Sequence, residues 1–288
     1  MKTKYIFLLF TSLFFASCSD DGFLSVEEDI ANIPVSNAPT ITAFLCPQDT
    51  VHKVSISYTR PVIGKNTYPE WIKNVGKAIV TLSNGEQIVT LKSGENSSGY
   101  FSIKAKDFKV EAGKTYTLNV TTYDGQKAEA TCTIPLNKVD LKKVNTKEVT
   151  DAKYQEKKYL ITWQDIPNEQ NYYAVYVVTK EVRRTYTYIS QEYSEQTISD
   201  QGNEGGKMIT KKSFYMTGRQ NFTNGEYRAT EIQIMNTDVN FYRYHKDLEI
   251  LTISGDNPLT EPINIYTNIK GGFGVFAGYN RANGIFVE

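Results

Sequence analysis

The stretch that decides the fold is KAIVTLSNGEQIVTL, residues 77–91. It holds two runs rich in β-branched and other apolar residues, 78–82 and 86–91, on either side of Asn84-Gly85. Asn-Gly between alternating apolar residues is the strongest short-range signal for a β-hairpin, because these two residues accept the positive φ angles of its tight turn. The stretch therefore predicts a hairpin and, with it, an antiparallel sheet.

Further strand-like segments lie on both sides of this hairpin. Turn-forming residues separate them at intervals of about 8–12 residues, which is typical of an all-β sandwich. The segments are 41–46, 54–58, 100–103, 116–120 and 128–134. Together with the hairpin they predict an antiparallel β-sandwich over residues 38–136.

A second set of strands follows a charged segment. Lysines and acidic residues are frequent in residues 137–155, which we interpret as a linker between two domains. Strand-like segments then recur within residues 156–288 and predict a second antiparallel β-sandwich. They lie at 159–163, 172–178, 185–189, 208–216 and 226–235.

One segment of the second domain has the period of a helix. Four large apolar residues share one helix face at the spacing i, i+3, i+7 and i+10. They are Phe241, Tyr244, Leu248 and Leu251. Asp238 stands at the position of an N-cap, and Gly255 ends the pattern. The sequence therefore predicts one helix near residues 238–253, with its apolar face packed on the second sandwich.

Composition favours strands and gives no reason to expect a strongly charged partner. The chain has 20 Tyr and 14 Phe, and aromatic and β-branched residues fit the pleated surface of a sheet. Its 32 Lys and Arg balance its 32 Asp and Glu. This balance argues against nucleic-acid binding, and no basic run indicates binding to anionic lipid.

The first residues are typical of a secretory signal peptide. Lys2 and Lys4 precede an apolar run, residues 5–16, which is too short as a helix to span a bilayer. Small residues then lead to Cys18. This order of basic, apolar and small residues predicts that residues 1–17 are removed from the mature protein.

The junction before Cys18 also resembles a bacterial lipobox, whose cysteine is lipidated and becomes the first residue of the mature protein. The alternative is an ordinary secreted protein with a cysteine at this place by chance. Asp20-Asp21 resembles the signal that takes some Gram-negative lipoproteins to the outer face of the outer membrane. We therefore expect a lipid anchor at Cys18, a flexible acidic tether over residues 18–37, and a body that faces the cell exterior.

Cys46 and Cys132 are the two remaining cysteines. In an oxidising compartment they could form a disulfide bond, which would stabilise the fold by about 4–5 kcal/mol in the chain-entropy model. They could equally be two buried thiols on separate strands. Geometry decides between these alternatives, and the sequence leaves both open.

The sequence holds no motif of a known catalytic site, zinc site or dinucleotide loop. We therefore expect no cofactor, no metal and no enzymatic activity. Asp200, Asn203 and Glu204 lie in a Gly-rich loop and could gather calcium, but they lack the alternating spacing of known calcium loops. His245 lies near the apolar face of the predicted helix, where an imidazole at the edge of the core is expected more often than a metal ligand.

Three segments near the C-terminal end resemble the domain of unknown function 4249 family. They are FYRYHKDLE (241–249), NPLTEPI (257–263) and NIKGGFGVFAG (268–278). The lipobox and the strands between Ile41 and Tyr58 fit the same family. The resemblance implies a surface or outer-membrane lipoprotein of Gram-negative bacteria, often encoded beside a TonB-dependent receptor. It implies no particular chemistry.

Two stretches also resemble known types of sandwich. Residues 77–135 are similar to the transthyretin-like sandwiches of carboxypeptidase regulatory domains, in which Tyr116 and Leu118 would face the core. Trp163 followed by Tyr172-Tyr173 resembles the fibronectin type III sandwich, where a tryptophan and a tyrosine pack across the core.

Two functions are consistent with these features. The first is a non-catalytic binding or accessory partner of a TonB-dependent transporter in the outer membrane. The second is a surface hydrolase that acts on peptide or glycan at a site between the two sandwiches.

For the first function we predict a partner surface near the C-terminal end. It consists of Gly271, Gly272, Phe273, Phe276 and Tyr279. Its glycines would let a strand approach another backbone closely, and its aromatic side chains would serve as anchors. The alternative is that this strand closes the second sandwich and buries Phe273 and Phe276.

Overall fold

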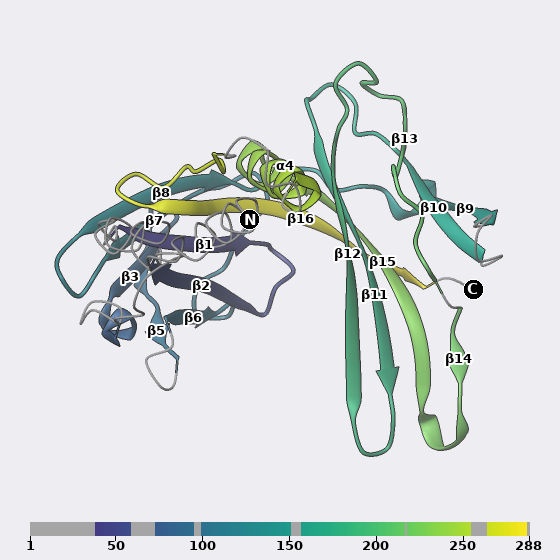
Figure 1. The fold of residues 1–288 in the computed structure, drawn as a ribbon, viewed down its shortest axis with the longest axis horizontal. Helices are drawn as coiled ribbons and strands as arrows, with labels where there is room; N and C mark the ends of the chain where they lie inside the picture. The colour runs from purple at the N-terminus through teal and green to yellow at the C-terminus, as the bar shows by residue number, and fades with distance from the viewer. Residues whose placement is uncertain are drawn as a thin grey trace, which may run out of the picture.

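The structure is a computed structural model, which describes residues 38–58, 73–94, 99–150, 157–216, 218–254 and 264–286. As predicted, the protein is mainly β, with several antiparallel sheets and, in this part of the chain, one α-helix (Figure 1). The predicted signal peptide, the lipidation site Cys18 and the tether lie outside the described residues.

A nine-stranded sheet, the long sheet, runs through the whole structure. Eight of its strands lie in the order β12-β11-β15-β16-β1-β2-β6-β5, and β14 pairs with β15 outside this order. The strands are β1 (Pro39–Leu45), β2 (Val51–Tyr58), β5 (Lys92–Ser93), β6 (Tyr100–Lys104), β11 (Tyr172–Val182), β12 (Thr187–Ser199), β14 (Gln220–Asn221), β15 (Tyr227–Thr237) and β16 (Phe273–Phe286).

Two smaller sheets and the helix complete the described structure. The four-stranded sheet has the order β4-β3-β7-β8, and the three-stranded sheet has the order β13-β10-β9. Their strands are β3 (Ile79–Ser83), β4 (Ile88–Thr90), β7 (Thr115–Thr121), β8 (Lys127–Thr133), β9 (Asn145–Thr150), β10 (Lys157–Gln164) and β13 (Lys207–Ile209). The helix is α4 (Val239–Ser254), and short 3-10 turns are η2 (Val75–Lys77), η4 (Leu141–Lys143) and η5 (Thr223–Gly225).

The hairpin predicted from residues 77–91 is confirmed. β3 and β4 pair antiparallel, with Ser83 opposite Ile88. Asn84 sets the turn, because its Oδ1 atom accepts hydrogen bonds from the backbone N–H groups of Glu86 (3.1 Å) and Gln87 (2.8 Å). The turn is longer than the predicted two-residue turn, since it holds residues 84–87, and only Gly85 has a positive φ, +89°.

The first hydrophobic core lies between the four-stranded sheet and the β1-β2-β6 part of the long sheet. Alternate side chains of each strand enter it, so that apolar residues at every second position are buried. Tyr116 and Leu118 face this core, as predicted. The largest side chains that are fully buried in it are Phe101, Phe108, Tyr116, Phe276, Ile41, Leu45, Leu82, Leu118 and Ile134.

The second core lies between the three-stranded sheet and the β11-β15 part of the long sheet. Trp163 and Tyr173 form its centre, with ring centroids 5.4 Å apart in an edge-to-face arrangement. The predicted contact between a tryptophan of one strand and a tyrosine of the next is therefore present.

The described part of the segment predicted as a linker (137–155), residues 137–150, belongs to this second body instead. It contains η4 and the strand β9, which pairs with β10 along its whole length. Val139 is buried in the second core. The lysines and acidic residues of this segment are typical of a linker, but they also suit β9, because β9 is an edge strand whose side chains are mostly exposed.

Strand β16 joins the two bodies. Its first part, Phe273 to Gly278, pairs parallel to β1, and its second part, from Tyr279, pairs antiparallel to β15. Phe276 is buried in the first core and Ala282 in the second. The predicted division at residues 156–288 therefore differs from the structure, since the last strand belongs to both bodies.

The glycines before and within β16 allow a close approach to backbone, as the sequence analysis proposed. That backbone, however, belongs to this chain. A Cβ atom on Gly274, whose φ is +96°, would lie 2.1 Å from the carbonyl oxygen of Ile41, and one on Gly271 would lie 2.2 Å from that of Lys127. These glycines are thus needed for intramolecular packing.

The predicted partner surface is therefore corrected. Phe276 is fully buried at 0% exposure, so its ring cannot anchor a partner. Phe273 is 46% exposed. The alternative prediction, in which β16 buries both rings in the second core, also differs from the structure, because Phe276 lies in the first core.

The two smaller sheets cover the same face of the long sheet. Side chains of β16 alternate between its faces, and Phe276 and Ala282 point toward the two cores. Val275, Ala277 and Tyr279 point to the opposite side, where α4 packs. We call this opposite side the helix face.

Helix α4 begins and packs largely as predicted. The Oδ1 atom of Asp238 accepts a hydrogen bond from the backbone N–H of Phe241 (2.8 Å), which caps the helix. Phe241 is buried on the helix face, whereas Leu248 is half-buried and Leu251 is exposed. The apolar stripe therefore anchors the helix mainly through its first turns. No helix among the described residues is long and apolar enough to cross a bilayer.

Burial shifts two titratable groups of α4 in ways that matter for stability. It raises the pKa of the Asp238 carboxyl to about 6. It lowers the pKa of the His245 imidazole to about 4, so this side chain is neutral at pH 7. The His245 ring stacks on Phe241 with centroids 4.0 Å apart, and its Nδ1 atom lies 2.9 Å from the carbonyl oxygen of Phe241.

The shared strand gives a first prediction. Phe276→Ala should lower the free energy of unfolding by about 3–5 kcal/mol, because the substitution leaves a cavity in the first core. Phe273→Ala, three residues earlier in the same strand, should cost much less, about 1 kcal/mol, because nearly half of its side chain is exposed. Urea denaturation of both variants measures this. Equal losses would show that the assignment of faces along β16 is wrong.

The pKa of His245 gives a second prediction. Below its ordinary pKa of 6.5 the unfolded chain takes up a proton that the folded chain does not take up until about pH 4. Stability is therefore lost as the pH falls through this range. In denaturation experiments, the free energy of unfolding of the wild type, relative to that of His245→Phe, should fall by about 2–3 kcal/mol between pH 7 and pH 4.

Asp238→Asn is the matched control, because Asn also caps helices. The carboxyl pKa rises on folding from 3.8 to about 6, so the stability that Asp238 contributes is present at low pH and lost as the pH rises through 6. As the pH rises from about 4 to 6, the wild type should therefore lose stability relative to Asp238→Asn. Over the same range it should gain stability relative to His245→Phe. If both differences in stability changed in the same direction with pH, the pKa shifts of Asp238 and His245 given above would be wrong.

Candidate functional site

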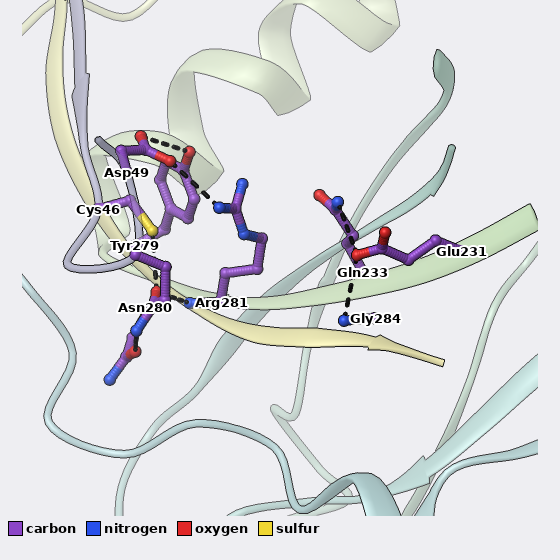
Figure 2. A network of polar contacts seen from close by, with 9 residues as sticks. Cys46, Asp49, Glu231, Gln233, Tyr279, Asn280, Arg281 and Gly284 are labelled. Carbon is purple, nitrogen blue, oxygen red and sulfur yellow. Dashed lines mark hydrogen bonds and ion pairs between the residues drawn. The ribbon is translucent and has the colours of Figure 1, made fainter. Parts of the chain in front are cut away.

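The candidate site is a hollow region on the helix face, the junction cleft. It lies where β16 leaves β1 and joins β15. Two adjoining hollows form it, and Phe44 and Tyr279 line both of them. Figure 2 shows the polar network at its base, to which β15, β16 and the turn after β1 contribute side chains.

The first hollow has a volume of about 490 Å³ and lies over β1 and β2. Its lining is rich in hydroxyl groups, since Thr42, Thr50 and Ser55 contribute one each. The exposed ring of Tyr100 and the ammonium group of Lys53 complete its outer side. This size lies within the range of known small-molecule sites.

The second hollow has a volume of about 440 Å³ and lies beside α4. Its apolar part includes Tyr176, Met235 and Phe241. Its polar part includes Lys180 and Gln233. An apolar lining with a few convergent polar groups is typical of ligand sites, because the apolar surface supplies binding energy and the polar groups fix orientation.

An ion pair connects the two hollows. The Nη2 atom of Arg281 lies 3.2 Å from Oδ1 of Asp49, and both side chains are largely shielded from solvent. The hydroxyl of Tyr279 donates to the other oxygen of Asp49 at 3.4 Å. Burial, together with the charge of Asp49, raises the pKa of Tyr279, so the phenol keeps its proton. The three side chains form one fixed polar group.

Gln48 holds this group to the rest of the junction. Its Oε1 atom accepts a hydrogen bond from the backbone N–H of Arg281 (3.0 Å), and its Nε2 atom donates to Oδ1 of Asn280 (3.1 Å). The Asn280 amide in turn donates to the carbonyl oxygens of Pro135 (3.0 Å) and Leu136 (3.1 Å). The turn after β1, the strand β16 and the segment after β8 are thereby tied together.

A second polar group lies on the β15 side. Oε1 of Glu231 accepts hydrogen bonds from Nε2 of Gln233 and from the backbone N–H of Gly284, both at 3.2 Å (Figure 2). The backbone bond ties Glu231 to the second part of β16. The carboxylate is therefore held in one place at the edge of the second hollow.

The two cysteines do not form a bridge in the structure. Cys46 and Cys132 are both buried free thiols. The Cys46 thiol donates to Oε1 of Gln48 at 2.9 Å and so belongs to the junction. Burial raises the pKa of both thiols. Of the two alternatives left open by the sequence, the structure contains the buried thiols.

The possible metal ligands are used in other ways. Oδ2 of Asp200 accepts a hydrogen bond from the backbone N–H of Asn171 (2.8 Å), and Asn203 donates to the carbonyl oxygen of Lys207 (3.1 Å). His245 lines the second hollow with a neutral ring. Within the described ranges, no group of three or more His, Cys, Asp or Glu side chains could hold a metal ion.

Only one residue of the predicted partner surface lies in the junction cleft. Tyr279 lines both hollows, whereas Gly271 lies at a separate hollow beside β7 and β8. Asp49 and Arg281 were not among the predicted site residues, and they are 232 residues apart in the chain. The only local signals for them are a polar turn after a buried strand and a lone arginine after an aromatic, Gly-rich strand.

Comparison with known proteins supports the family resemblance. The model of a family described as Domain of unknown function (DUF4249) matches residues 27–284. A comparison with curated proteins finds no match. The family match includes both cores, α4, most of β16 and the junction cleft. The chain therefore belongs to the domain of unknown function 4249 family.

Proposed function

We propose that this protein is a non-catalytic binding protein of the cell surface, which holds a ligand in the junction cleft for a TonB-dependent transporter. The observation that carries the proposal is the fixed ion pair of Arg281 with Asp49 between two hollows of suitable size for a small ligand. A lipid at Cys18 anchors the protein to the outer membrane in this proposal.

The geometry of the cleft favours binding because its polar groups are already ordered. Arg281 is held by Asp49 through its side chain and by Gln48 through its backbone. Glu231 is held by Gln233 and Gly284. A ligand that binds to such groups has little side-chain ordering to induce, which lowers the free-energy cost of association.

The chemistry of the cleft favours holding a ligand over transforming it. Asp49 is engaged in an ion pair, and the phenol of Tyr279 keeps its proton. His245 presents a neutral, stacked ring whose Nδ1 lies beside a backbone carbonyl. These groups can donate and accept hydrogen bonds without a change of protonation.

The cellular location is inferred from the amino-terminal sequence. Residues 1–17 have the order of a signal peptide, and Cys18 and Asp20-Asp21 resemble a lipidation site and an outer-membrane export signal. Two or more acyl chains on one cysteine would give stable membrane association, which a single myristoyl chain does not. The link to a TonB-dependent transporter rests on the family resemblance.

We also propose that the two bodies are variants of known sandwiches. The edge-to-face contact of Trp163 with Tyr173 supports a fibronectin type III-like second body. The burial of Tyr116 and Leu118 between facing sheets supports a transthyretin-like first body. The shared strand β16 distinguishes this arrangement from two independent sandwiches.

Purification of the lipidated protein from outer membranes tests the proposed function. A TonB-dependent transporter should copurify in near-equal amount. Cys18→Ala should leave the protein unprocessed or soluble and abolish this recovery, because the variant cannot be acylated. Cys46→Ala is the matched control and should remain membrane-bound, since the thiol of Cys46 is buried. A wild-type protein that stays solitary and turns over a peptide or glycan would instead support the hydrolase alternative.

A further inference from the structure

Two hairpins of the long sheet end side by side beyond the second hollow of the junction cleft, which Lys180 and Ile189 also line. The first joins β11 to β12, and the second joins β14 to β15. Pairing of Val182 with Tyr227 places the two turns next to each other, and Figure 1 shows both at the lower end of the view. We call residues 180–189 and 219–228 together the hairpin end.

The hairpin end is basic, although the chain as a whole has a formal net charge of zero. It contains four of the seven arginines of the chain, together with Lys180 and only two acidic residues, Glu181 and Glu226. The arginines are Arg183, Arg184, Arg219 and Arg228. The excess of three positive charges is created by the fold, because neither segment alone is a basic run.

The hairpin end also exposes large apolar and aromatic side chains. Tyr186 is 55% exposed, Tyr188 58% and Ile189 60%. Phe222, from the second hairpin, is partly exposed beside them. Exposed aromatic residues grouped on one projecting part of a protein mark a contact surface, because burying them against a partner is favourable.

Internal contacts hold this surface in shape. Arg183 forms an ion pair with Glu181 at 2.8 Å and with Glu226 at 3.5 Å. Its guanidinium group also lies 3.7 Å from the ring centroid of Phe222, on the other hairpin. Both acidic residues of the hairpin end are therefore engaged by Arg183, while Arg184, Arg219 and Arg228 are exposed at its surface.

We propose that the hairpin end docks on the anionic, phosphate-bearing outer surface of the membrane to which the lipid anchors the body. The guanidinium fork of arginine matches the geometry of phosphate oxygens better than the ammonium group of lysine does. Tyrosine is enriched where lipid headgroups meet the hydrocarbon region, because its ring is apolar and its hydroxyl is polar. A basic, aromatic and projecting surface fits a broad anionic layer, whereas a single small ligand would require a hollow.

The membrane contact deepens the proposed function and rests on it for the location of the protein. A basic patch beside an acyl anchor gives a second attachment, which would orient the body on the membrane. The sequence shows no sign of binding to anionic lipid, because no run of neighbouring residues is basic. The structure brings the charges together from segments about forty residues apart.

Vesicle sedimentation tests this proposal without the lipid anchor. The probe is the mature chain, residues 18–288, with Cys18→Ala, so that neither signal peptide nor acyl chains contribute. It should bind vesicles of phosphatidylcholine that contain lipopolysaccharide, and not vesicles of phosphatidylcholine alone. Arg184→Ala with Arg219→Ala should weaken binding about 25-fold, roughly fivefold per arginine. Added salt should weaken it further.

Lys142→Ala with Lys143→Ala is the control, because it removes the same charge from an exposed turn elsewhere. It should leave vesicle binding unchanged, and circular dichroism should show that both double variants are folded. Equal loss in both variants, no preference for the anionic vesicles, or tighter binding to a single-stranded oligonucleotide would overturn the proposal. Failure here would leave acylation of Cys18 and recovery of a transporter intact, so the two proposals are tested separately.

Discussion

The two hydrogen-bond ladders of β16 are the constraint on which the rest of the structure depends. One strand pairs with β1 in its first part and with β15 in its second, so the sheets of both bodies become one. Its alternating side chains then set the faces: Phe276 and Ala282 enter the two cores, and Val275 and Ala277 support α4. The junction cleft exists because this strand changes neighbours there.

The polar groups of the junction serve structure and site at once. Asn280, Gln48 and Asp49 satisfy buried donors and acceptors where the two bodies meet, which would otherwise cost free energy. The same contacts hold the guanidinium of Arg281 at the base of the cleft. A ligand bound in the cleft, as proposed, would therefore be coupled to the packing of the two bodies, because the residues that it would touch also fix β16 in place.

Local patterns in the sequence predicted local structure well. The hairpin around Asn84, the contact of Trp163 with Tyr173 and the cap of α4 at Asp238 all depend on residues close in the chain. The pairing of β1 with β16, the ion pair of Asp49 with Arg281 and the basic hairpin end depend on segments that only the fold brings together. The glycines before and within β16 were correctly expected to let two backbones approach closely. The sequence pattern does not identify the second backbone, which belongs to this chain and not to a partner.

The position of β16 in the chain has a consequence for the order of folding. The first body is made of early residues, yet Phe276 and the partner strand of β1 come from the last part of the chain. During synthesis from the N-terminal end, β1 could pair with β2 but would keep its other edge unpaired, and the core would stay unfilled, until β16 has emerged. Contacts of such high sequence separation form slowly, and an incomplete core exposes apolar surface in the meantime. The first body therefore cannot close until the last strand of the chain has been made.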